Sequence, residues 1–586
     1  MGVPGFFAWI LKNCNDFNII KQILLDIDIL YLDTNCLLHP QCLYVLEKFK
    51  SYNCCDDQCK MENDMIDAIC TYILKIIDVV KPRCKIFVAI DGVAPMAKIN
   101  QQRKRRYKSI YDEELKNNIM KKHDIKCNDI KWSNVSISPG TEFMEKIHQR
   151  LCVFLDNLSR ESKIPITYSS YHTHGEGEHK ILQDIKENII NDRNKRLVVY
   201  GLDADLIFLT LTCNRTDLFL LREESYLTKK NTNEISGNEQ NFCFVSIDMF
   251  RTAINYIIRD LIDANKNNAT SENSANDDND IDDNNDYEYD FVFDFVLICF
   301  MMGNDFLPNI PSIDIGNKGL EYLLSCYVKI FIEFGYGIVT DDLQINNKQF
   351  VNFIKKLHEG EDYYFKYIFP NKIYLKQHTK KKFENEYEKD LYELENLVCD
   401  LNIYDPVRLG VGNIYDYKFR YYSHNFNSSY NQIKLINTIC YEYLKGIKWV
   451  FNYYFLKCSD WTWQYPFLHG PFLSDIYSYT SNNNININNY IFDLHSPLVP
   501  FEQLLLIIPP QYVTLLPEAY HKYMLSTNSL IADYFPIKIE IDFIGKDKLW
   551  KGIPLLPVIE LDRIRKVITD DLRYDQCNLY LNDIIY

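Results

Sequence analysis

The chain has 586 residues, of which 47% are hydrophobic, so it is long enough for several domains and too apolar to be globally disordered. Its net charge of −16 excludes a uniformly basic surface for nucleic acid, although a local basic groove is compatible with that value. The sequence has no run of 18 apolar residues, and its N-terminus, MGVPGFFAWI, lacks the basic region and apolar run of a signal peptide. We therefore expect a soluble intracellular protein, nuclear or cytoplasmic, that does not contact a membrane.

Short apolar runs alternate with helical patterns in the first 200 residues. Three runs are predicted to be buried strands and three patterns to be helices: Ile27–Leu32, Ile86–Ile90 and Leu197–Tyr200, and Asp64–Val80, Glu142–Asn157 and Glu178–Ile190. Strands separated by long helices indicate an α/β fold with a mostly parallel, twisted sheet flanked by helices. Ligands of such sheets gather at the carboxyl ends of the strands.

Aspartates follow each of the three predicted strands. Asp33 and Asp91 come directly after the first two, and Asp203 and Asp205 lie shortly after the third. Each could merely cap a helix or a turn. As a set at one sheet edge, however, these carboxylates would repel one another unless cations neutralised them.

Three further acidic residues extend this set. Glu176 and Glu178 flank a glycine in HGEGEHK, just before a predicted helix, and Asp305 follows the apolar run Phe295–Met302 and Gly303. Carboxylate oxygens favour Mg²⁺ or Mn²⁺ over zinc. Two such ions about 4 Å apart can activate a water and stabilise the leaving oxygen of a phosphodiester. The acidic residues therefore predict phosphoryl transfer to water.

A basic segment, Lys98–Lys108, begins seven residues after Asp91 and contains no acidic residue. On a helix, four of its polar residues share one face: Lys98, Gln102, Arg105 and Arg106. Such a face could hold a terminal phosphate beside the metals. A solvated basic run or a localisation signal is the alternative.

The cysteines suggest no second metal centre with standard spacing. Free thiols in a reducing compartment explain most of the 18. Cys54, Cys55 and Cys59, with Cys42 and His39 upstream, leave a structural zinc site open as an alternative.

Long segments of the chain resemble the eukaryotic 5′→3′ exoribonucleases, the Xrn/Rat family, whose catalytic core belongs to the PIN-like and flap-endonuclease superfamily. The similar segments include YLDTNCLLHP, AIDGVAPMAKINQQRKRRYKS, HGEGEHKI, YGLDADLIFLTL, FMMGNDFLPNIPSIDI, SDWTWQYPF and LWKGIPLLPVIELDRI. They extend from Met1 to near Lys566. The resemblance implies processive, metal-dependent degradation of single-stranded RNA from a 5′ monophosphate to mononucleotides, in RNA decay or processing.

The resemblance also implies roles for individual residues. The family's metal-binding carboxylates match Asp33, Asp91, Glu176, Glu178, Asp203, Asp205 and Asp305. Its 5′-phosphate pocket matches Lys98, Gln102, Arg105 and Arg106, and the residues that stack on terminal nucleotides match His39 and either Trp461 or Trp463. The alternative for these aromatic residues is a place in an ordinary core.

Three residues depart from the family pattern: Met96 stands for an Arg, His174 for a Pro and Cys36 for a Gly. We expect none of them to touch a metal ligand, although Met96 removes a positive charge near the expected phosphate pocket. A flap-type DNA nuclease, which shares the carboxylate site, and a non-catalytic RNA-binding protein are the alternative functions.

The expected domains follow from an insert of about Ala264 to Asp290, which is rich in Asn and Asp and predicted to be disordered. Residues 1–263 and 291–345 are expected to form two parts of the catalytic core. Residues 346–586 are expected to form a largely helical second region that closes over the active site.

Overall fold

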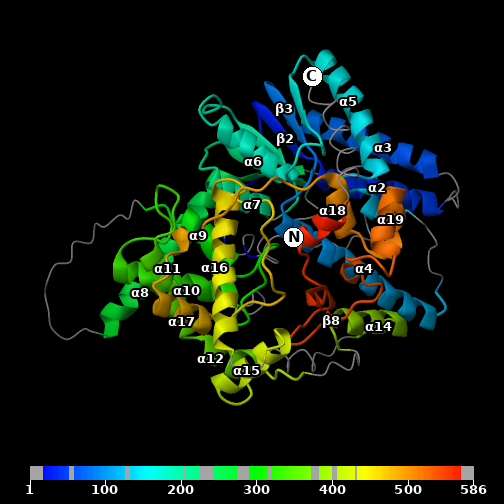
Figure 1. Cartoon of the computed structure of the whole chain (residues 1–586). Coiled ribbons are helices and arrows are strands. Elements are labelled where there is room, and N and C mark those ends of the chain that lie inside the picture. The colour runs from blue at the N-terminus through cyan, green and yellow to red at the C-terminus, as the bar shows by residue number, and fades with distance from the viewer. Residues whose placement is uncertain are drawn as a thin grey trace.

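A computed structural model describes Trp9, Asn13 and residues 17–51, 58–125, 132–203, 205–223, 242–272, 289–313, 318–370, 382–398, 405–428 and 432–568. The long helix α16 lies at the centre of Figure 1, with α8 to α11 and α17 on one side and α4, α18 and α19 on the other. Strands β2 and β3 lie above these helices in the same view. Within the described residues, none of the helices is both long enough and apolar enough to cross a membrane.

The first part of the chain forms a seven-stranded sheet in the order β1-β7-β6-β5-β2-β3-β4. The strands from β6 to β4 pair in parallel, whereas β7 pairs antiparallel with both β6 and β1. The fold is therefore α/β with a mostly parallel sheet, as predicted. The strands are β1 (Ile20–Lys21), β2 (Ile29–Asp33), β3 (Lys85–Ala89), β4 (Ile166–Ser169), β5 (Leu197–Tyr200), β6 (Leu218–Glu223) and β7 (Phe242–Ser246).

Helices cover both faces of this sheet because its central strands are apolar on both sides. In β2, Ile29 and Tyr31 face one hydrophobic core, and Leu30 and Leu32 face another. The helices that contribute to one core or the other are α2 (Asn35–Ser51), α3 (Gln58–Val80), α5 (Glu142–Ser162), α6 (Gly177–Glu187), α7 (Asp205–Thr212), α8 (Ile247–Glu272) and α9 (Val292–Phe300). The three predicted strands and three predicted helices are confirmed, with bounds shifted by a few residues.

The rest of the chain is largely helical, as expected. Its helices are α10 (Gly319–Phe334), α11 (Asn347–His358), α12 (Glu361–Tyr363), α14 (Glu386–Glu395), α15 (Ile414–Asn425), α16 (Ile433–Phe455), α17 (Leu473–Asn483), α18 (Pro500–Ile507), α19 (Glu518–Leu525) and α20 (Leu561–Val567). A short hairpin, β8 (Ile541–Asp542) and β9 (Ile553–Pro554), interrupts them. Trp449 of α16 lies in the same core as Ile207 of α7 and Phe295 of α9, so the two regions share one apolar interior.

Helix α4 (Met96–Lys122) joins the sheet to this helical region. Its backbone begins with a hydrogen bond from the Met96 amide to the Trp461 carbonyl, and it packs against α18 and α14. Helix α8 continues to Glu272, so the first residues of the expected insert are helical in backbone. Residues 273–288 of that insert lie outside the described part of the chain.

Candidate active site

Carboxylates meet at the carboxyl edge of three adjacent strands. Asp33 is the last residue of β2, Asp91 lies two residues after β3, and Asp205 begins α7 after β5. Because β5, β2 and β3 are parallel neighbours, their carboxyl ends lie side by side. Asp203, between β5 and α7, is exposed, whereas the other three aspartates are largely withdrawn from solvent.

The charges of these residues act on one another. Burial and the charge of Asp91 raise the pKa of Asp33 to about 8, and burial and the charge of Glu176 raise the pKa of Asp91 to about 6. Burial and the charge of Asp305 raise the pKa of Asp205 to about 7. Like charges and loss of solvent both disfavour ionisation, so the cluster needs positive charge to be fully ionised at neutral pH.

The N-terminus of α6 brings two glutamates to the same place. Glu176 caps the helix and Glu178 lies in its first turn, and both are buried. The Gly177 amide between them donates to Asp91 Oδ1 at 2.6 Å. A Cβ at position 177 would lie 2.8 Å from Asp33 Oδ1. The glycine therefore lets the helix approach the strand carboxylates.

Lys98 connects this group to the seventh carboxylate. Its Nζ lies 2.7 Å from Glu176 Oε1 and 2.9 Å from Asp305 Oδ2. Burial alone would lower the pKa of Lys98, but Asp305 and Glu176 outweigh it and raise the pKa well above its usual value. Lys98 is therefore a charged lysine within the acidic cluster, at the end of the face it shares with Gln102.

The donor set fits divalent cations. Asp33 Oδ1 and Glu178 Oε2 are buried and have no hydrogen-bond partner among the described residues. Burying such oxygens costs free energy unless a ligand satisfies them. Carboxylate oxygens are the ligands that Mg²⁺ and Mn²⁺ prefer.

His179 is a residue of this site that the sequence did not single out. Potential ligand atoms of Glu176, Glu178 and His179 lie within 4.8 Å of one another. Burial and the charge of Lys98 lower the pKa of His179 well below its usual value, so the imidazole is neutral. The only signal in the sequence was its place next to Glu178 in HGEGEHK.

Helix α16 covers the glutamates from the second region. The Tyr453 hydroxyl donates to Glu176 Oε2 at 2.9 Å, and its ring lies 3.6 Å, centroid to centroid, from that of His179. Tyr453 also stacks on Trp449. These contacts join residues 277 positions apart and close one side of the site.

The predicted basic face lies next to the acidic cluster. Arg105 is exposed, and Arg106 donates to Ser138 Oγ while its Nη1 has no partner among the described residues. Burial and the like charge of Arg105 lower the pKa of Arg106 to about 9. An anion bound here would offset both effects.

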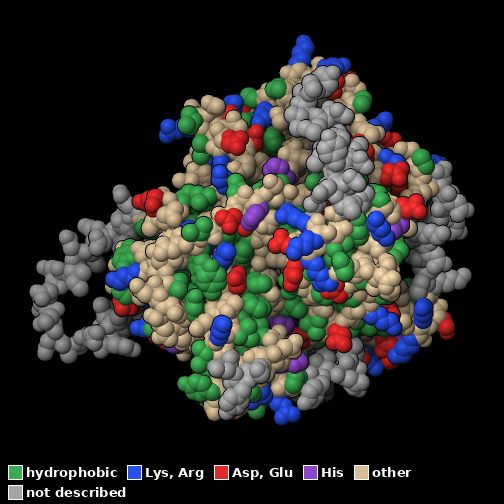
Figure 2. Space-filling view, viewed as in Figure 1, with side chains coloured by type: hydrophobic (Ala, Val, Ile, Leu, Met, Phe, Trp, Pro, Cys, Tyr) green, Lys and Arg blue, Asp and Glu red, His purple; other side chains and the backbone are tan. Residues whose placement is uncertain are grey.

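The basic run is not one continuous surface. Arg103 is fully buried and donates to the carbonyls of Tyr534 and Pro557, and Lys108 pairs with Asp112. The alternative of a solvated basic run therefore does not hold for these two residues. Figure 2 shows acidic and basic side chains interspersed over the described part of one face, in keeping with the negative net charge.

His39 lies close to the charged groups, whereas Trp461 lies beside His174 and Trp463 is part of the core. Burial, Arg105 and Arg106 lower the pKa of His39 to about 4, so this ring is neutral and within reach of the basic face. Trp463 is only 6% exposed and stacks on Trp449 with ring centroids 5.0 Å apart. Trp461 is partly exposed and makes an edge contact with His174.

One departure from the family pattern does touch a candidate ligand, contrary to expectation. The Cys36 thiol donates to Asp33 Oδ2 at 2.9 Å, because α2 begins directly after β2 and turns this side chain back over the strand end. Burial and the charge of Asp33 raise the pKa of Cys36 well above its usual value, so the group is a neutral thiol. Met96 is fully buried in a core with Leu505 and Ile507, so its side chain does not face the phosphate pocket. Of the cysteines in the alternative zinc site, Cys54 and Cys55 lie outside the described residues.

Comparisons with known proteins point to one family. A family model described as the XRN 5′-3′ exonuclease N-terminus matches residues 1–224, and one described as the Xrn1 helical domain matches 284–397 and 371–573. The chain is 29% identical over 610 residues to human 5′-3′ exoribonuclease 1. The aligned region covers 96% of this chain and 34% of the human protein. It is 26% identical over 701 residues to 5′-3′ exoribonuclease 1 of Saccharomyces cerevisiae, with 98% of this chain and 43% of the relative covered.

A third relative is matched over a larger share of its length. The chain is 27% identical over 666 residues to the 5′-3′ exoribonuclease 2 homolog of Drosophila melanogaster, with 98% of this chain and 71% of the relative covered. The chain thus spans about a third of the human relative and less than half of the yeast one. Its two matched regions together place it in a family: the chain belongs to the Xrn family of 5′-3′ exonucleases.

Proposed function

We propose that this protein is a processive, metal-dependent 5′→3′ exoribonuclease that hydrolyses single-stranded RNA with a 5′ monophosphate to mononucleotides. The observation that carries the proposal is the juxtaposition of seven carboxylates with the basic face of α4, joined by Lys98. The names of the relatives, 5′-3′ exoribonuclease 1 and 2, support the same direction of degradation.

The carboxylates are the proposed holders of two Mg²⁺ or Mn²⁺ ions, and they are Asp33, Asp91, Glu176, Glu178, Asp203, Asp205 and Asp305. Such ions supply an activated water and stabilise the leaving oxygen of a phosphodiester. Around them, the Gly177 amide and Asn35 orient the Asp91 carboxylate, and Tyr453 orients that of Glu176. Lys98 balances part of the negative charge when a phosphate approaches.

The basic face would anchor the end of the RNA. Gln102, Arg105 and Arg106, with Lys98, would offer a phosphate charge-assisted hydrogen bonds, which are stronger than neutral ones. A neutral His39 and Trp461 could stack on bases of any identity. Trp463, already stacked on Trp449, has less free surface for this role.

The division of labour between regions is part of the proposal. Residues 1–263 and 291–345 would form the catalytic core on either side of an acidic insert, and residues 346–586 would close over it. The hydrogen bond from Tyr453 to Glu176 supports this closure. We propose an intracellular location for the enzyme, in keeping with its free thiols.

The deciding experiment compares RNAs of one sequence that carry a 5′ monophosphate, a 5′ triphosphate or a 5′ hydroxyl, each labelled at the 3′ end, with Mg²⁺. We expect rapid shortening of the monophosphate RNA and release of mononucleotides, because the basic face of α4 would bind one terminal phosphate beside the carboxylates. Equal rates on all three ends, or internal cleavage products, would contradict the proposal.

Two further substrates separate the alternatives. Single-stranded DNA and flap junctions should be degraded much more slowly than RNA, and the opposite order would identify a flap-type nuclease. The Asp203→Ala variant should leave RNA intact under the same conditions. If the RNA stayed equally intact with the wild type and with this variant, the protein would be an RNA-binding protein without turnover.

A further inference from the structure

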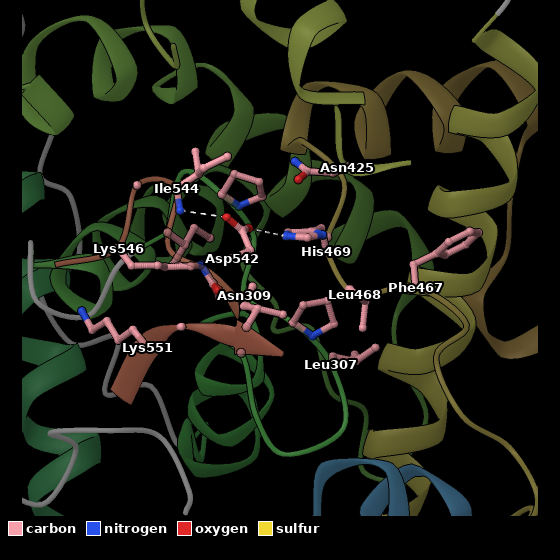
Figure 3. A pocket seen from close by; sticks show the side chains of 18 of the residues that line it. Leu307, Asn309, Asn425, Phe467, Leu468, His469, Asp542, Ile544, Lys546 and Lys551 are labelled. Atoms are coloured by element: carbon pink, nitrogen blue, oxygen red, sulfur yellow. Dashed lines mark hydrogen bonds and ion pairs between the residues drawn. The ribbon is translucent and has the colours of Figure 1, made fainter. Parts of the chain in front are cut away.

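A second cavity lies against helix α4, on a different face from the one that carries Lys98 and Gln102. It has a volume of about 450 Å³, within the range of small-molecule sites. Ala97, Asn100, Gln101 and Lys104 line it from α4. Their spacing of three and four residues puts them on one side of the helix. Figure 3 shows part of its wall, in which His469 pairs with Asp542 and the Ile544 amide donates to the same carboxylate, whereas Phe467 lies apart from them.

This cavity borders the acidic cluster. The segment Met302–Asn309 forms part of its wall, and that segment contains Asp305, whose carboxylate pairs with Lys98. The two sites are thus separated by one loop and one helix.

Three lining residues have buried polar atoms without a hydrogen-bond partner among the described residues: Gln101 Oε1, Asn304 Nδ2 and His469 Nδ1. Asn304 is fixed in orientation, because its Oδ1 accepts from the amides of Phe306 and Leu307, so its Nδ2 is a free donor. Buried polar groups are normally satisfied, and three unsatisfied ones on a single cavity point to a polar ligand.

The pairing of His469 determines what its free nitrogen requires. Nε2 lies 2.9 Å from Asp542 Oδ2, so Nε2 carries the proton and donates to the carboxylate. Burial lowers the pKa of His469 despite this partner, which keeps the ring neutral. Nδ1 is therefore an acceptor, as is Gln101 Oε1, and both match the hydroxyl or amino groups of a nucleoside.

Lys104, one of the cations that line the cavity, has no counter-ion among the described residues. Lys104 makes no ion pair or hydrogen bond with the described residues, whereas Asp305 and Asp542 are already paired with Lys98 and His469. Burial and the like charge of Arg103 lower the pKa of Lys104 to about 8. An anionic group bound beside Lys104 would compensate the free-energy cost of burying its charge.

Aromatic side chains complete the lining. Tyr421 and Phe467 form apolar parts of the wall, and Trp550, which is 55% exposed, lies at its edge. A large aromatic surface left to solvent beside a polar cavity suits the face of a nucleobase.

We propose that this cavity binds a nucleoside 5′-monophosphate, with its phosphate at Lys104, its sugar or base polar groups at Gln101, Asn304 and His469, and its base against the aromatic wall. The choice of ligand rests on the proposed function, since mononucleotides are its products. The cavity would hold the released nucleotide outside the carboxylate cluster and make the enzyme sensitive to its own product.

The test measures binding of AMP to the full chain by calorimetry in EDTA, so that metal-dependent binding at the carboxylates is removed. We expect Lys104→Met to weaken AMP binding at least tenfold, and Lys116→Met, farther along α4 and half exposed, to leave it unchanged. Trp550→Ala provides a second variant at an exposed position, and it should also weaken binding. Loss of AMP binding in Arg105→Ala but not in Lys104→Met would overturn the proposal, because the nucleotide would then occupy the phosphate pocket.

Two controls complete the design. Inorganic phosphate should bind at least tenfold more weakly than AMP, and equal affinities would reduce the cavity to a simple anion site and refute the proposal. RNA degradation by the wild type is measured in parallel. Degradation of RNA without measurable AMP binding would refute the nucleotide-binding role of the cavity alone. AMP binding without RNA degradation would refute the proposed function and leave a nucleotide-binding site.

Discussion

The sheet edge and helix α4 carry the two charge clusters of this protein, and they position their residues by different means. At the edge, the parallel order of β5, β2 and β3 forces the residues after each strand into one place, so the predicted carboxylates that follow these strands converge. On α4, the basic residues of Lys98–Lys108 lie in three different environments: the carboxylate cluster, the protein interior and the exposed surface. Lys98 pairs with carboxylates, Arg103 is buried and Arg105 is exposed.

This contrast shows that sheet topology gathers charges, whereas a helix distributes them around its axis. A charge run on a helix therefore has to be assigned residue by residue. The following experiments test that distinction, beginning with the largest expected effect.

Replacement of a sheet-edge carboxylate should have the largest consequence. Asp205→Asn removes one of the buried negative charges at the start of α7 and should lower the rate of RNA degradation roughly 10²- to 10³-fold, the size typical of a lost electrostatic contact in an active site. Single-turnover kinetics with Mg²⁺ measure this rate of RNA degradation. Asp67→Asn, an exposed carboxylate on α3 that pairs with Arg150, is the matched control and should keep the wild-type rate. Similar losses in both variants would indicate a general effect of charge.

Loss of the buried arginine of α4 should affect stability and not chemistry. Arg103→Met leaves the Tyr534 and Pro557 carbonyls without their donors, which should lower the free energy of unfolding by about 3 kcal/mol. Denaturant unfolding measures the change. Arg105→Met, two positions away but exposed, should change stability by no more than about 0.5 kcal/mol. If Arg105→Met destabilised the protein more than Arg103→Met, the hydrogen bonds from Arg103 to Tyr534 and Pro557 would not stabilise the packing of α4 on the second region.

Loss of the exposed arginine should instead affect recognition of the RNA end. Arg105→Ala should slow degradation of 5′-monophosphate RNA by about ten- to a hundredfold, equivalent to one or two charge-assisted hydrogen bonds, with a much smaller effect on 5′-hydroxyl RNA. Lys116→Ala, on the same helix but distant from the site, controls for net charge. Equal losses on both RNA ends would show that Arg105 contacts the backbone of the strand and not its terminus.

The effect of pH on the metal-free protein should be smaller but directional. The folded-state pKa values of Asp33, Asp91 and Asp205 are raised to about 8, 6 and 7 from 3.8, so the folded state binds more protons than the unfolded state between about pH 4 and 8. Stability therefore falls as pH rises through this window. Thermal unfolding in EDTA should show a declining Tm from pH 6 to 8, and Mg²⁺ should raise the Tm most at pH 8.

A matched variant sharpens this prediction. Asp33→Asn should flatten the decline and reduce the stabilisation by Mg²⁺, because it removes the carboxylate whose pKa is raised most among the three. Asp67→Asn should retain the wild-type profile. A Tm that rises between pH 6 and 8 in EDTA would show that the cluster is not electrostatically strained without metal.

Much of the fold and of the acidic site followed from local sequence. Apolar runs followed closely by Asp33, Asp91 and Asp205 identified strands of a parallel sheet, and that topology implied one shared edge. These inferences needed only periodicity and the geometry of adjacent strands. The helical character of the second region was likewise confirmed.

Only the tertiary structure decided the contacts between distant segments. The burial of Trp463 and the approach of Tyr453 to Glu176 depend on how α16 packs. The second cavity is assembled from α4, the loop after α9 and the β8–β9 hairpin, segments up to about 450 positions apart. Periodicity fixes which face of an element is apolar, whereas packing of non-local elements selects which polar atoms meet and which remain unsatisfied.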